Sequence, residues 1–205
     1  LTDLIFPVIH GEFGEDGQLQ SLMDSAGIEY CGSATQSSRL CINKIATKQS
    51  VSNVGVRVPK SFQFNDPAQC NAVELINKLG ENLVIKPVAQ GSSVSLFLIS
   101  GLRELEKQLD ELSPGDWMVE ERVYGREVTI GVLENHPLGV VEVIPMGGVY
   151  DYERKYTSGA TEYRFPAVLD KEIENENKSF AIRSFEACGC RDFARIDFLL
   201  CEDGN

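Results

Sequence analysis

A lysine at the end of an apolar run is the first feature of this sequence that suggests chemistry. The run Leu83–Ile85 predicts a buried strand that ends at Lys86 and the proline after it. A lysine in such a run either directs its ammonium group to solvent or meets an anion, because an uncompensated buried charge is costly. Gly91, Ser92 and Ser93 follow, and they offer close backbone approach and hydroxyl donors to phosphate oxygens. The pattern favours a phosphate site unlike a Walker loop, since the lysine precedes the glycine. The alternative is a β-hairpin with a solvated lysine and a polar turn.

A second pair of charged residues, Arg195 and Asp197, lies on the predicted strand Phe193–Leu200. Side chains alternate between the two faces of a strand, so both charges lie on the same face. An aspartate there can bind Mg²⁺, and an arginine beside it can bind an anion or an oxyanion. Mg²⁺ needs further oxygen ligands, which we expect beyond Asn205. The alternative is an exposed sheet face that carries a salt bridge.

Acidic residues join two further predicted strands. Glu120, Glu121 and Glu127 can accept hydrogen bonds from an adenine amino group or from ribose hydroxyls. The backbone around Val123 is available to pair with a purine edge. The alternative is a solvated acidic turn.

Tyrosines and a lysine are dense in the long predicted loop 147–163. Tyr150, Lys155 and Tyr156 suit a lid that closes over a phosphate and excludes water. The alternative is a surface loop that is merely rich in tyrosine. Lys44 is a weaker candidate, because a single lysine on a helix is usually solvated.

The composition is that of a globular chain with excess negative charge. Of the 205 residues 42% are apolar and 24% are charged, and the net charge is −12. This charge argues against nucleic acid or an anionic membrane as the main partner. No apolar run approaches the length of about 18 residues that a membrane helix needs, and no signal pattern opens the chain, so we expect a cytoplasmic protein. The six cysteines lack Cys-x-x-Cys spacing and lie mostly in apolar contexts, which argues against a disulfide framework or a zinc site.

Both ends of the sequence look incomplete. The chain opens directly on a predicted strand at 4–9, and it closes on a turn that normally leads into a partner strand. We therefore expect it to be the middle of a longer protein. Periodicity and turn signals predict the other elements: helices at 19–26, 38–54, 66–79 (with Val73, Ile76 and Leu79 buried), 102–112 and 170–188, and strands at 28–31, 83–87, 94–99, 117–123, 127–133 and 138–146.

Taken together, these stretches resemble the D-alanine:D-alanine ligase family of the ATP-grasp fold, over essentially all 205 residues. Each motif is weak alone, but their common order is specific. The matching segments are Phe6-Pro7-Val8-Ile9-His10-Gly11, Gly14-Glu15-Asp16-Gly17, Asn43-Lys44, Ile85-Lys86-Pro87, Gly91-Ser92-Ser93-Val94, Glu120-Glu121, Gly125-Arg126-Glu127, Tyr150-Asp151-Tyr152-Glu153-Arg154-Lys155-Tyr156, and Gly189-Cys190-Arg191 through Ala194-Arg195-Ile196-Asp197.

The resemblance implies a mixed α/β and α+β architecture in three parts. These are the end of an N-terminal α/β (preATP-grasp) domain at 1–32, a central ATP-grasp subdomain at 33–123 and an incomplete C-terminal subdomain at 124–205. ATP would be gripped between the central and last parts. The implied ATP-binding residues are Lys44, Lys86, Ser92, Ser93, Glu120, Glu121, Val123, Glu127 and Lys155.

The resemblance also implies the remaining site residues and the reaction. D-Alanine would be bound by His10, Tyr150, Tyr156 and Arg195, catalytic roles would fall to Arg195, Ser92, Tyr156 and Lys155, and Asp197 would bind Mg²⁺ or Mn²⁺. ATP would phosphorylate the carboxylate of one D-alanine, and the amine of a second would attack the acyl phosphate, giving D-alanyl-D-alanine for peptidoglycan synthesis. The complete protein would be a homodimer.

Two positions depart from the family pattern, and other functions stay open. Ser95 stands where the family usually has glycine, and Arg122 where it usually has a large apolar or aromatic residue. The chain also ends before the Asn-Glu-x-Asn metal segment of the family, so we expect the 205 residues alone to be inactive. The alternatives are a ligase that joins D-alanine to D-lactate or D-serine, another carboxylate:amine ligase of the ATP-grasp fold, and a regulatory nucleotide-binding module without catalysis.

Overall fold

The computed structural model describes residues 4–90, 95–145 and 161–201. The helices are α1 (Gln18–Ala26), α2 (Thr35–Ile42), α3 (Lys44–Asn53), the 3₁₀ helix η1 (Pro67–Gln69), α4 (Ala72–Leu79), α5 (Leu102–Glu111) and α7 (Lys171–Ala187). The strands are β1 (Ser61–Phe64), β2 (Asn82–Pro87), β3 (Phe97–Ser100), β4 (Trp117–Glu121), β5 (Arg126–Leu133), β6 (His136–Pro145), β7 (Thr161–Arg164) and β8 (Phe193–Leu200). Within these ranges no helix combines the length and the apolar character that crossing a membrane requires.

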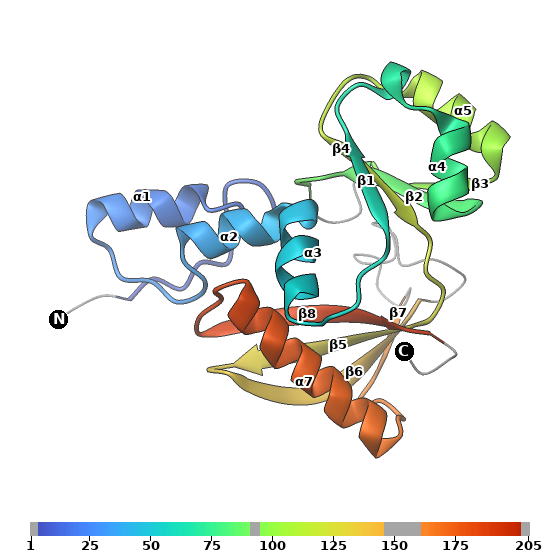
Figure 1. Ribbon diagram of the computed structural model, residues 1–205. Helices are drawn as coiled ribbons and strands as arrows, with labels where there is room; N and C mark the ends of the chain where they lie inside the picture. Colours follow the sequence, from blue (N-terminus) through green and yellow to red (C-terminus); the bar gives the residue numbers. More distant parts are fainter. Residues whose placement is uncertain (1–3, 91–94, 146–160, 202–205) are drawn as a thin grey trace.

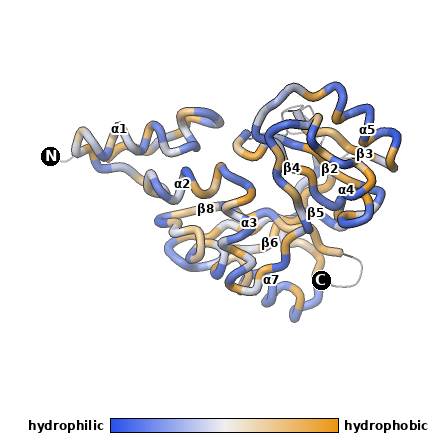
Figure 2. Tube along the Cα trace, turned by 45° about the horizontal axis from the view of Figure 1, so that its top comes forward, coloured by the Kyte–Doolittle hydropathy of each residue, from blue (hydrophilic) through white to orange (hydrophobic). Residues whose placement is uncertain are grey.

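The first sheet has the strand order β1-β4-β2-β3, and all neighbouring strands are antiparallel. Figure 1 shows α4 and α5 together beside this sheet. Alternate side chains of β2 and β4 explain the packing, because Leu83, Ile85 and Val119 point to one face and are fully buried there. They meet Leu75 of α4 and Leu105 of α5 in one apolar core. Figure 2 shows hydrophobic and hydrophilic residues interleaved along the chain, as one-sided burial of helices requires.

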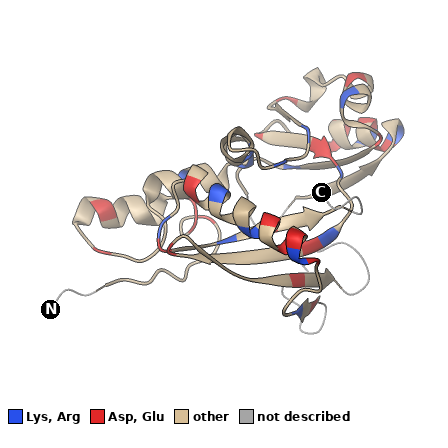
Figure 3. Cartoon of the chain, turned by 60° about the horizontal axis from the view of Figure 1, so that its bottom comes forward, with Lys and Arg blue, Asp and Glu red and all other residues tan. Residues whose placement is uncertain are grey.

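The second sheet has the antiparallel order β7-β6-β5-β8, and α7 lies across one face of it (Figure 1). Val128 and Ile130 of β5 are fully buried against Ala181 and Phe185 of α7. Figure 3 shows acidic and basic residues spread along the helices. The helix therefore buries one face on the sheet and presents the other to solvent.

Helix α3 precedes the first sheet in the chain and packs against α7, the helix of the second sheet. Val51 of α3 and Val56, which follows the helix, form a small buried cluster with Cys188, which follows α7. Cys188 behaves as a small buried hydrophobe, as we expected of the cysteines, whereas Cys41 is exposed. The division at residues 33 and 124 stays a prediction, although α3 contributes to packing on the C-terminal side of that division.

The prediction of continuous strands at 4–9 and 28–31 is wrong. In the described residues, segments 4–9 and 28–31 share a single parallel bridge, between Ile5 and Tyr30. Val8 is 72% exposed, so residues 4–9 lack the burial that an apolar strand needs, whereas Tyr30 in the second segment is buried. Helix α1 between them agrees with the prediction, and Gly27 ends it in the left-handed conformation.

Two predicted helices are each broken by an asparagine cap. The helix expected at 38–54 is divided at Asn43, whose extended backbone ends α2 and whose side chain accepts a hydrogen bond from Ala46 N–H in α3. The helix expected at 66–79 is divided in the same way, because Asn71 caps α4 after the short helix η1. The helical spacing of apolar residues continues across such breaks, so periodicity alone does not reveal them. The second break also changes the buried stripe, since Leu75 and Leu79 are buried while Val73 is 52% exposed.

The remaining differences concern strand ends. Strand β3 begins at Phe97 rather than at residue 94, and β4 ends at Glu121 rather than at residue 123. The predicted loop 147–163 ends early, because Thr161–Arg164 forms β7 and pairs with β6. The rest of that loop, residues 147–160, lies outside the described residues. Helices α5 and α7 and strands β2, β5, β6 and β8 agree with the predictions to within two residues.

Candidate functional site

The first wall of the candidate site is the face of the first sheet that α4 and α5 leave uncovered. Lys86 of β2 lies opposite Met118 of β4, and Val84 lies opposite Glu120. Because side chains alternate along both strands, Lys86 and Glu120 point to the face opposite the apolar core. The predicted lysine at the end of β2 is therefore directed at the space between the sheets and not at the core.

The second wall is the face of the second sheet that α7 leaves uncovered. In the antiparallel register of β5 and β8, Thr129 lies opposite Asp197 and Gly131 lies opposite Arg195. The core residues of β5 are the even-numbered ones, so Glu127 and Thr129 share the other face with Arg195 and Asp197. Our prediction that Arg195 and Asp197 occupy one face of one strand is confirmed.

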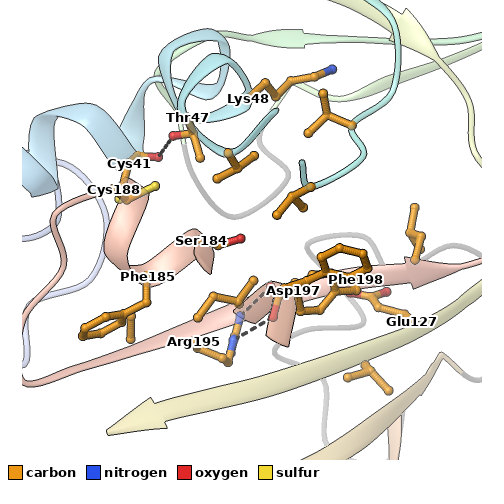
Figure 4. Close-up of a pocket in the computed structure, with 18 of the residues that line it drawn as sticks. Cys41, Thr47, Lys48, Glu127, Ser184, Phe185, Cys188, Arg195, Asp197 and Phe198 are labelled. Carbon is orange, nitrogen blue, oxygen red and sulfur yellow. Dashed lines mark hydrogen bonds and ion pairs between the residues drawn. The ribbon is translucent and has the colours of Figure 1, made fainter. Parts of the chain in front are cut away.

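Both walls line one cavity of about 1650 Å³. The cavity is large for a small-molecule site, which typically has about 300–1,000 Å³. Figure 4 shows Lys48 of α3 on one side and Glu127, Arg195 and Asp197 on the other. The predicted site residues that the structure places on this one cavity are His10, Lys86, Glu120, Glu121, Val123, Glu127, Arg195 and Asp197.

A buried carboxylate joins two lysines at the first wall. The Glu120 side chain, 10% exposed, binds the ammonium group of Lys86 through one oxygen and that of Lys48 through the other, the latter at 2.7 Å. Burial raises the pKa of Glu120, but the charges and hydrogen bonds of Lys86 and Lys48 outweigh burial and hold the pKa below its usual value. Glu120 is therefore an ionised centre that holds cations from two separate elements.

Lys44 lies beside this cluster at the first position of α3. Its backbone N–H binds Val88 carbonyl at 3.0 Å, and its ammonium group donates to the carbonyls of Pro87 at 3.1 Å, Val88 at 3.4 Å and Gln90. The break in the helix at Asn43 is what brings Lys44 to these carbonyls. Lys44 thus supports the chain that leaves β2 just before the loop in which we predicted Ser92 and Ser93.

Two lysines at this wall, Lys44 and Lys48, have lowered pKa values and therefore lose their protons more readily than a solvated lysine. Burial and, to a smaller extent, the positive charge of Lys86 lower the pKa of Lys44 to about 8, and the charge of Glu120 partly opposes both effects. Burial also lowers the pKa of Lys48, against the charge of Glu120. Lys48 and Lys86 bind the Glu120 carboxylate, and Lys44 lies beside them with its ammonium group on backbone carbonyls. Together with Glu120 and the nearby Glu121, the three lysines leave an excess of positive charge that can bind an anion such as a phosphate.

Asp197 fits one part of a magnesium site. Its carboxylate accepts hydrogen bonds from Arg195 at 3.0 and 3.1 Å and from the Thr129 hydroxyl at 2.7 Å, and it is about half exposed on the cavity face. Magnesium is commonly held by one or two carboxylates, with phosphate oxygens and water completing the shell. Within the described ranges, no group of three or more His, Cys, Asp or Glu side chains could hold a metal ion. Asp197 can therefore serve as a ligand only together with phosphate oxygens or other groups.

The linker after β4 has partners within the protein. The Glu121 carboxylate accepts a hydrogen bond from Lys60 N–H at 2.8 Å, and the Arg122 N–H binds Asn82 carbonyl at 2.8 Å. The guanidinium group of Arg122 lies 4.8 Å from the centre of the Tyr124 ring. These contacts hold the linker around Val123 at the cavity, while roles for Glu121 and Val123 in adenine binding stay predictions.

At the N-terminal side, His10 lies in a loop shaped by glycine. The His10 ring nitrogen Nδ1 is 3.9 Å from Glu15, and the imidazole is mostly exposed. A Cβ on Gly14 would lie only 2.2 Å from the carbonyl oxygen of Ile9, so this position needs glycine for the close approach. The loop thus presents His10 at the cavity edge.

Several predicted site residues lie outside the described residues: Ser92, Ser93, Tyr150, Lys155 and Tyr156. Ser95, which follows the first of these segments, has a φ of 55°. That left-handed conformation favours glycine, which is the residue that the family pattern has there. The departure at Ser95 therefore falls at a position where the backbone itself prefers glycine.

Sequence reasoning missed Lys48. It lies one helical turn after Lys44, on the same side of α3, and it lines the cavity. The i, i+4 spacing of the two lysines was a usable signal. The spacing does not reveal the carboxylate that Lys48 binds, because Glu120 is 72 residues away in the sequence.

Two antiparallel sheets that are each backed by helices, and that face one shared cavity lined by lysines and carboxylates, define an ATP-grasp protein. The family model described as D-ala D-ala ligase C-terminus matches residues 51–205, and the model described as D-ala D-ala ligase N-terminus matches residues 1–33. The chain therefore belongs to the D-alanine–D-alanine ligase family.

Individual relatives agree with this assignment. The chain is 40% identical over 204 residues to the D-alanine–D-alanine ligase of Aquifex aeolicus, covering 98% of this chain and 68% of that protein. It is 38% identical over 206 residues to the ligase of Syntrophotalea carbinolica, covering 99% and 66%. Among solved structures, the VanG D-Ala:D-Ser ligase of Enterococcus faecalis matches with a TM-score of 0.84 and 35% identity, covering 99% of this chain and 61% of that one. The chain thus spans about two thirds of the length of the relatives it matches.

Proposed function

We propose that the complete protein joins two D-alanines into D-alanyl-D-alanine at the expense of ATP, for peptidoglycan precursor synthesis. The observation that carries this proposal is the single cavity with a lysine-rich wall and an Arg195–Asp197 wall facing one another. Relatives that are 38% and 40% identical are named D-alanine–D-alanine ligase, which supports the same reaction here.

ATP binds between the two sheets in this proposal. Lys86 and Lys44 bind its phosphates, with Ser92, Ser93 and Lys155 covering them, and Glu127 binds the ribose. The adenine lies beside Val123, at the linker that Glu121 and Arg122 hold in place. Glu120 then keeps the lysines in position, in addition to the adenine contact that we predicted for it. Asp197 holds one magnesium ion, which neutralises charge on the transferring phosphoryl group when it is bound.

The amino-acid substrates bind at the Arg195 end of the cavity. His10 and Tyr156 face the first D-alanine, whose carboxylate receives the phosphoryl group. Arg195 stabilises the oxyanion that forms when the second amine attacks, and the amide then forms with release of phosphate. The bidentate contact between Arg195 and Asp197 fixes the guanidinium group on the cavity face before substrate binds, which lowers the cost of ordering it.

A ligase that joins D-alanine to D-serine is the second candidate, because a D-Ala:D-Ser ligase is 35% identical to this chain. The test is turnover of the full-length protein with MgATP and D-alanine, alone or together with D-serine or D-lactate, with products identified by mass. We expect D-alanyl-D-alanine in all three mixtures. A predominantly mixed product would assign the protein to the second class, and ATP binding without turnover would favour a regulatory module.

A further inference from the structure

A clamp at the start of β8 grips the N-terminal segment, and it is separate from the cavity contacts described above. Arg191 donates through Nε to Gly32 carbonyl at 2.6 Å and through a terminal nitrogen to Tyr30 carbonyl at 3.2 Å. Asp192 accepts a hydrogen bond from Gly32 N–H at 2.7 Å. The guanidinium group of Arg191 also lies 4.8 Å from the centre of the Tyr30 ring. We call these four residues the Arg191–Asp192 clamp, which joins segments about 160 residues apart in the sequence.

The clamp extends toward the His10 loop through backbone and ring contacts. Ile5 N–H donates to Glu29 carbonyl at 3.0 Å, and Cys31 N–H donates to Ile5 carbonyl at 2.9 Å. Phe6 stacks on Phe193, with ring centres 5.4 Å apart and an angle of 19° between the planes. The segment that leads to His10 is thus attached both to the clamped residues and to the first residue of β8.

These contacts matter because the segment has little other packing. Leu4 is 61% exposed and Val8 is 72% exposed, so burial does not hold residues 4–9 in place. Small polar contacts between parts of a chain generally allow relative motion. A few directed hydrogen bonds and one ring stack therefore determine where this segment lies.

At its other end the clamp leads directly to Arg195. Asp192 has a φ of 60°, and its carbonyl accepts a hydrogen bond from Glu134 N–H at 2.7 Å, where β5 turns into β6. Glycine adopts this left-handed conformation most readily, and aspartate is one of the few other residues that visit it. In this conformation the aspartate carboxylate accepts the hydrogen bond from Gly32 N–H. Arg195 follows three residues later on the same strand.

We propose that Arg191 and Asp192 are positioning residues, which keep the His10 segment in register with Arg195 so that the first amino acid is presented to both. This inference rests on the proposed ligase function. The proposal predicts different effects on D-alanine and on ATP, because the clamp residues are not among the hydrogen-bond partners of the Lys48–Glu120–Lys86 cluster. Loss of the clamp should weaken use of D-alanine and leave ATP binding unchanged.

The decisive variant is Asp192→Gly in the full-length protein. It removes the carboxylate and also relieves the left-handed backbone, so it does not destabilise the turn itself. We expect the KM for D-alanine to rise at least tenfold, with the Kd for ATP within twofold of the wild-type value. Asp192→Asn keeps an acceptor oxygen and should restore the KM to within threefold. Arg191→Ala should behave like Asp192→Gly.

Arg183→Ala is the matched control. Arg183 also donates to a backbone carbonyl, that of Val54 at 2.8 Å, and lies 4.6 Å from the centre of the Phe180 ring, but it does not contact residues 30–32. It should leave the KM for D-alanine unchanged. An unchanged KM in Asp192→Gly would overturn the proposal, as would an equal rise in the KM for D-alanine and the Kd for ATP.

A second readout does not depend on catalysis. Hydrogen exchange of the peptide covering residues 4–12 should accelerate at least tenfold in Asp192→Gly, with no change in the peptide covering β2. Equal hydrogen-exchange rates of this peptide in wild type and variant would overturn the proposal that the clamp holds residues 4–12. If the wild-type protein made no dipeptide, the proposed function would fail, and the exchange measurement would still decide whether the clamp holds the segment.

Discussion

Replacement of Lys48 by methionine removes one of the two ammonium groups that bind the buried carboxylate of Glu120. Both side chains are largely buried, with 15% and 10% of their surfaces exposed, and their atoms are 2.7 Å apart. Methionine has a similar length and no charge, so the change isolates the ion pair. After it, Glu120 is neutralised by Lys86 alone, and Lys86 is held more tightly away from a phosphate.

The magnitude follows from two opposing effects. Loss of a hydrogen bond between charged groups costs about 1.5–3 kcal/mol. The burial that lowers the pKa of Lys48 means that its charge is unfavourable there, and removal of that charge returns part of the cost. We therefore expect the free energy of unfolding to fall by about 1–2 kcal/mol. The loss of one positive charge from the cluster should raise the Kd for ATP about tenfold, which corresponds to about 1.4 kcal/mol.

The assays are urea unfolding and calorimetric titration with ATP, on the full-length protein. Lys48→Arg keeps the charge and the donors and should retain most of the stability and affinity. Lys78→Met is the surface control, because Lys78 pairs with Glu74 on α4 and is 60% exposed, and such pairs contribute at most about 0.5 kcal/mol. Unchanged stability and ATP affinity in Lys48→Met, or equal losses in Lys78→Met, would refute the role that we give to Lys48.

The other predictions concern pH, turnover and packing. Because the pKa of Lys44 is about 8, its deprotonation should weaken ATP binding about tenfold at pH 9 relative to pH 7, whereas Lys44→Arg should show no such step in calorimetric titrations. Over the same range stability should rise, since the folded-state pKa lies below the unfolded value of 10.5 and the unfolded chain binds more protons; urea unfolding at pH 7–10 checks this sign. Arg195→Ala should lower kcat at least about a hundredfold with little loss of stability, and a near-normal rate would remove Arg195 from the oxyanion role. Leu75→Ala should cost about 3 kcal/mol in urea unfolding and Val73→Ala less than about 0.5 kcal/mol; the reverse order would mean that our account of the α4 core is wrong.

Much of the site was predictable because it depends on strand alternation. In β8 a period of two is enough to place Arg195 and Asp197 together, and the neighbouring strand only has to supply a partner such as Thr129. Lys86 was recognisable for a similar reason, since a charge at the end of a buried strand must face away from the core. Local rules were sufficient for these positions.

The parts that sequence reasoning missed depend on contacts between distant segments. Lys48 has a carboxylate partner on a strand 72 residues away, and its i, i+4 spacing from Lys44 does not by itself reveal that partner. The breaks at Asn43 and Asn71 arise from side-chain caps that compete with continued helix, and periodicity does not register them. The segment 4–9 has the composition of a strand, but in the described residues it has only one bridge as a partner.

The most direct test of the central claim follows one oxygen atom through the reaction. Full-length protein is incubated with MgATP and D-alanine that carries ¹⁸O in its carboxylate, and the released phosphate is analysed by mass. If the two walls of the cavity act together as proposed, the carboxylate attacks ATP, and each phosphate released with a dipeptide carries one ¹⁸O from D-alanine. Dipeptide formation with unlabelled phosphate would contradict the acyl-phosphate route, and no dipeptide at all would contradict the function assigned to this cavity.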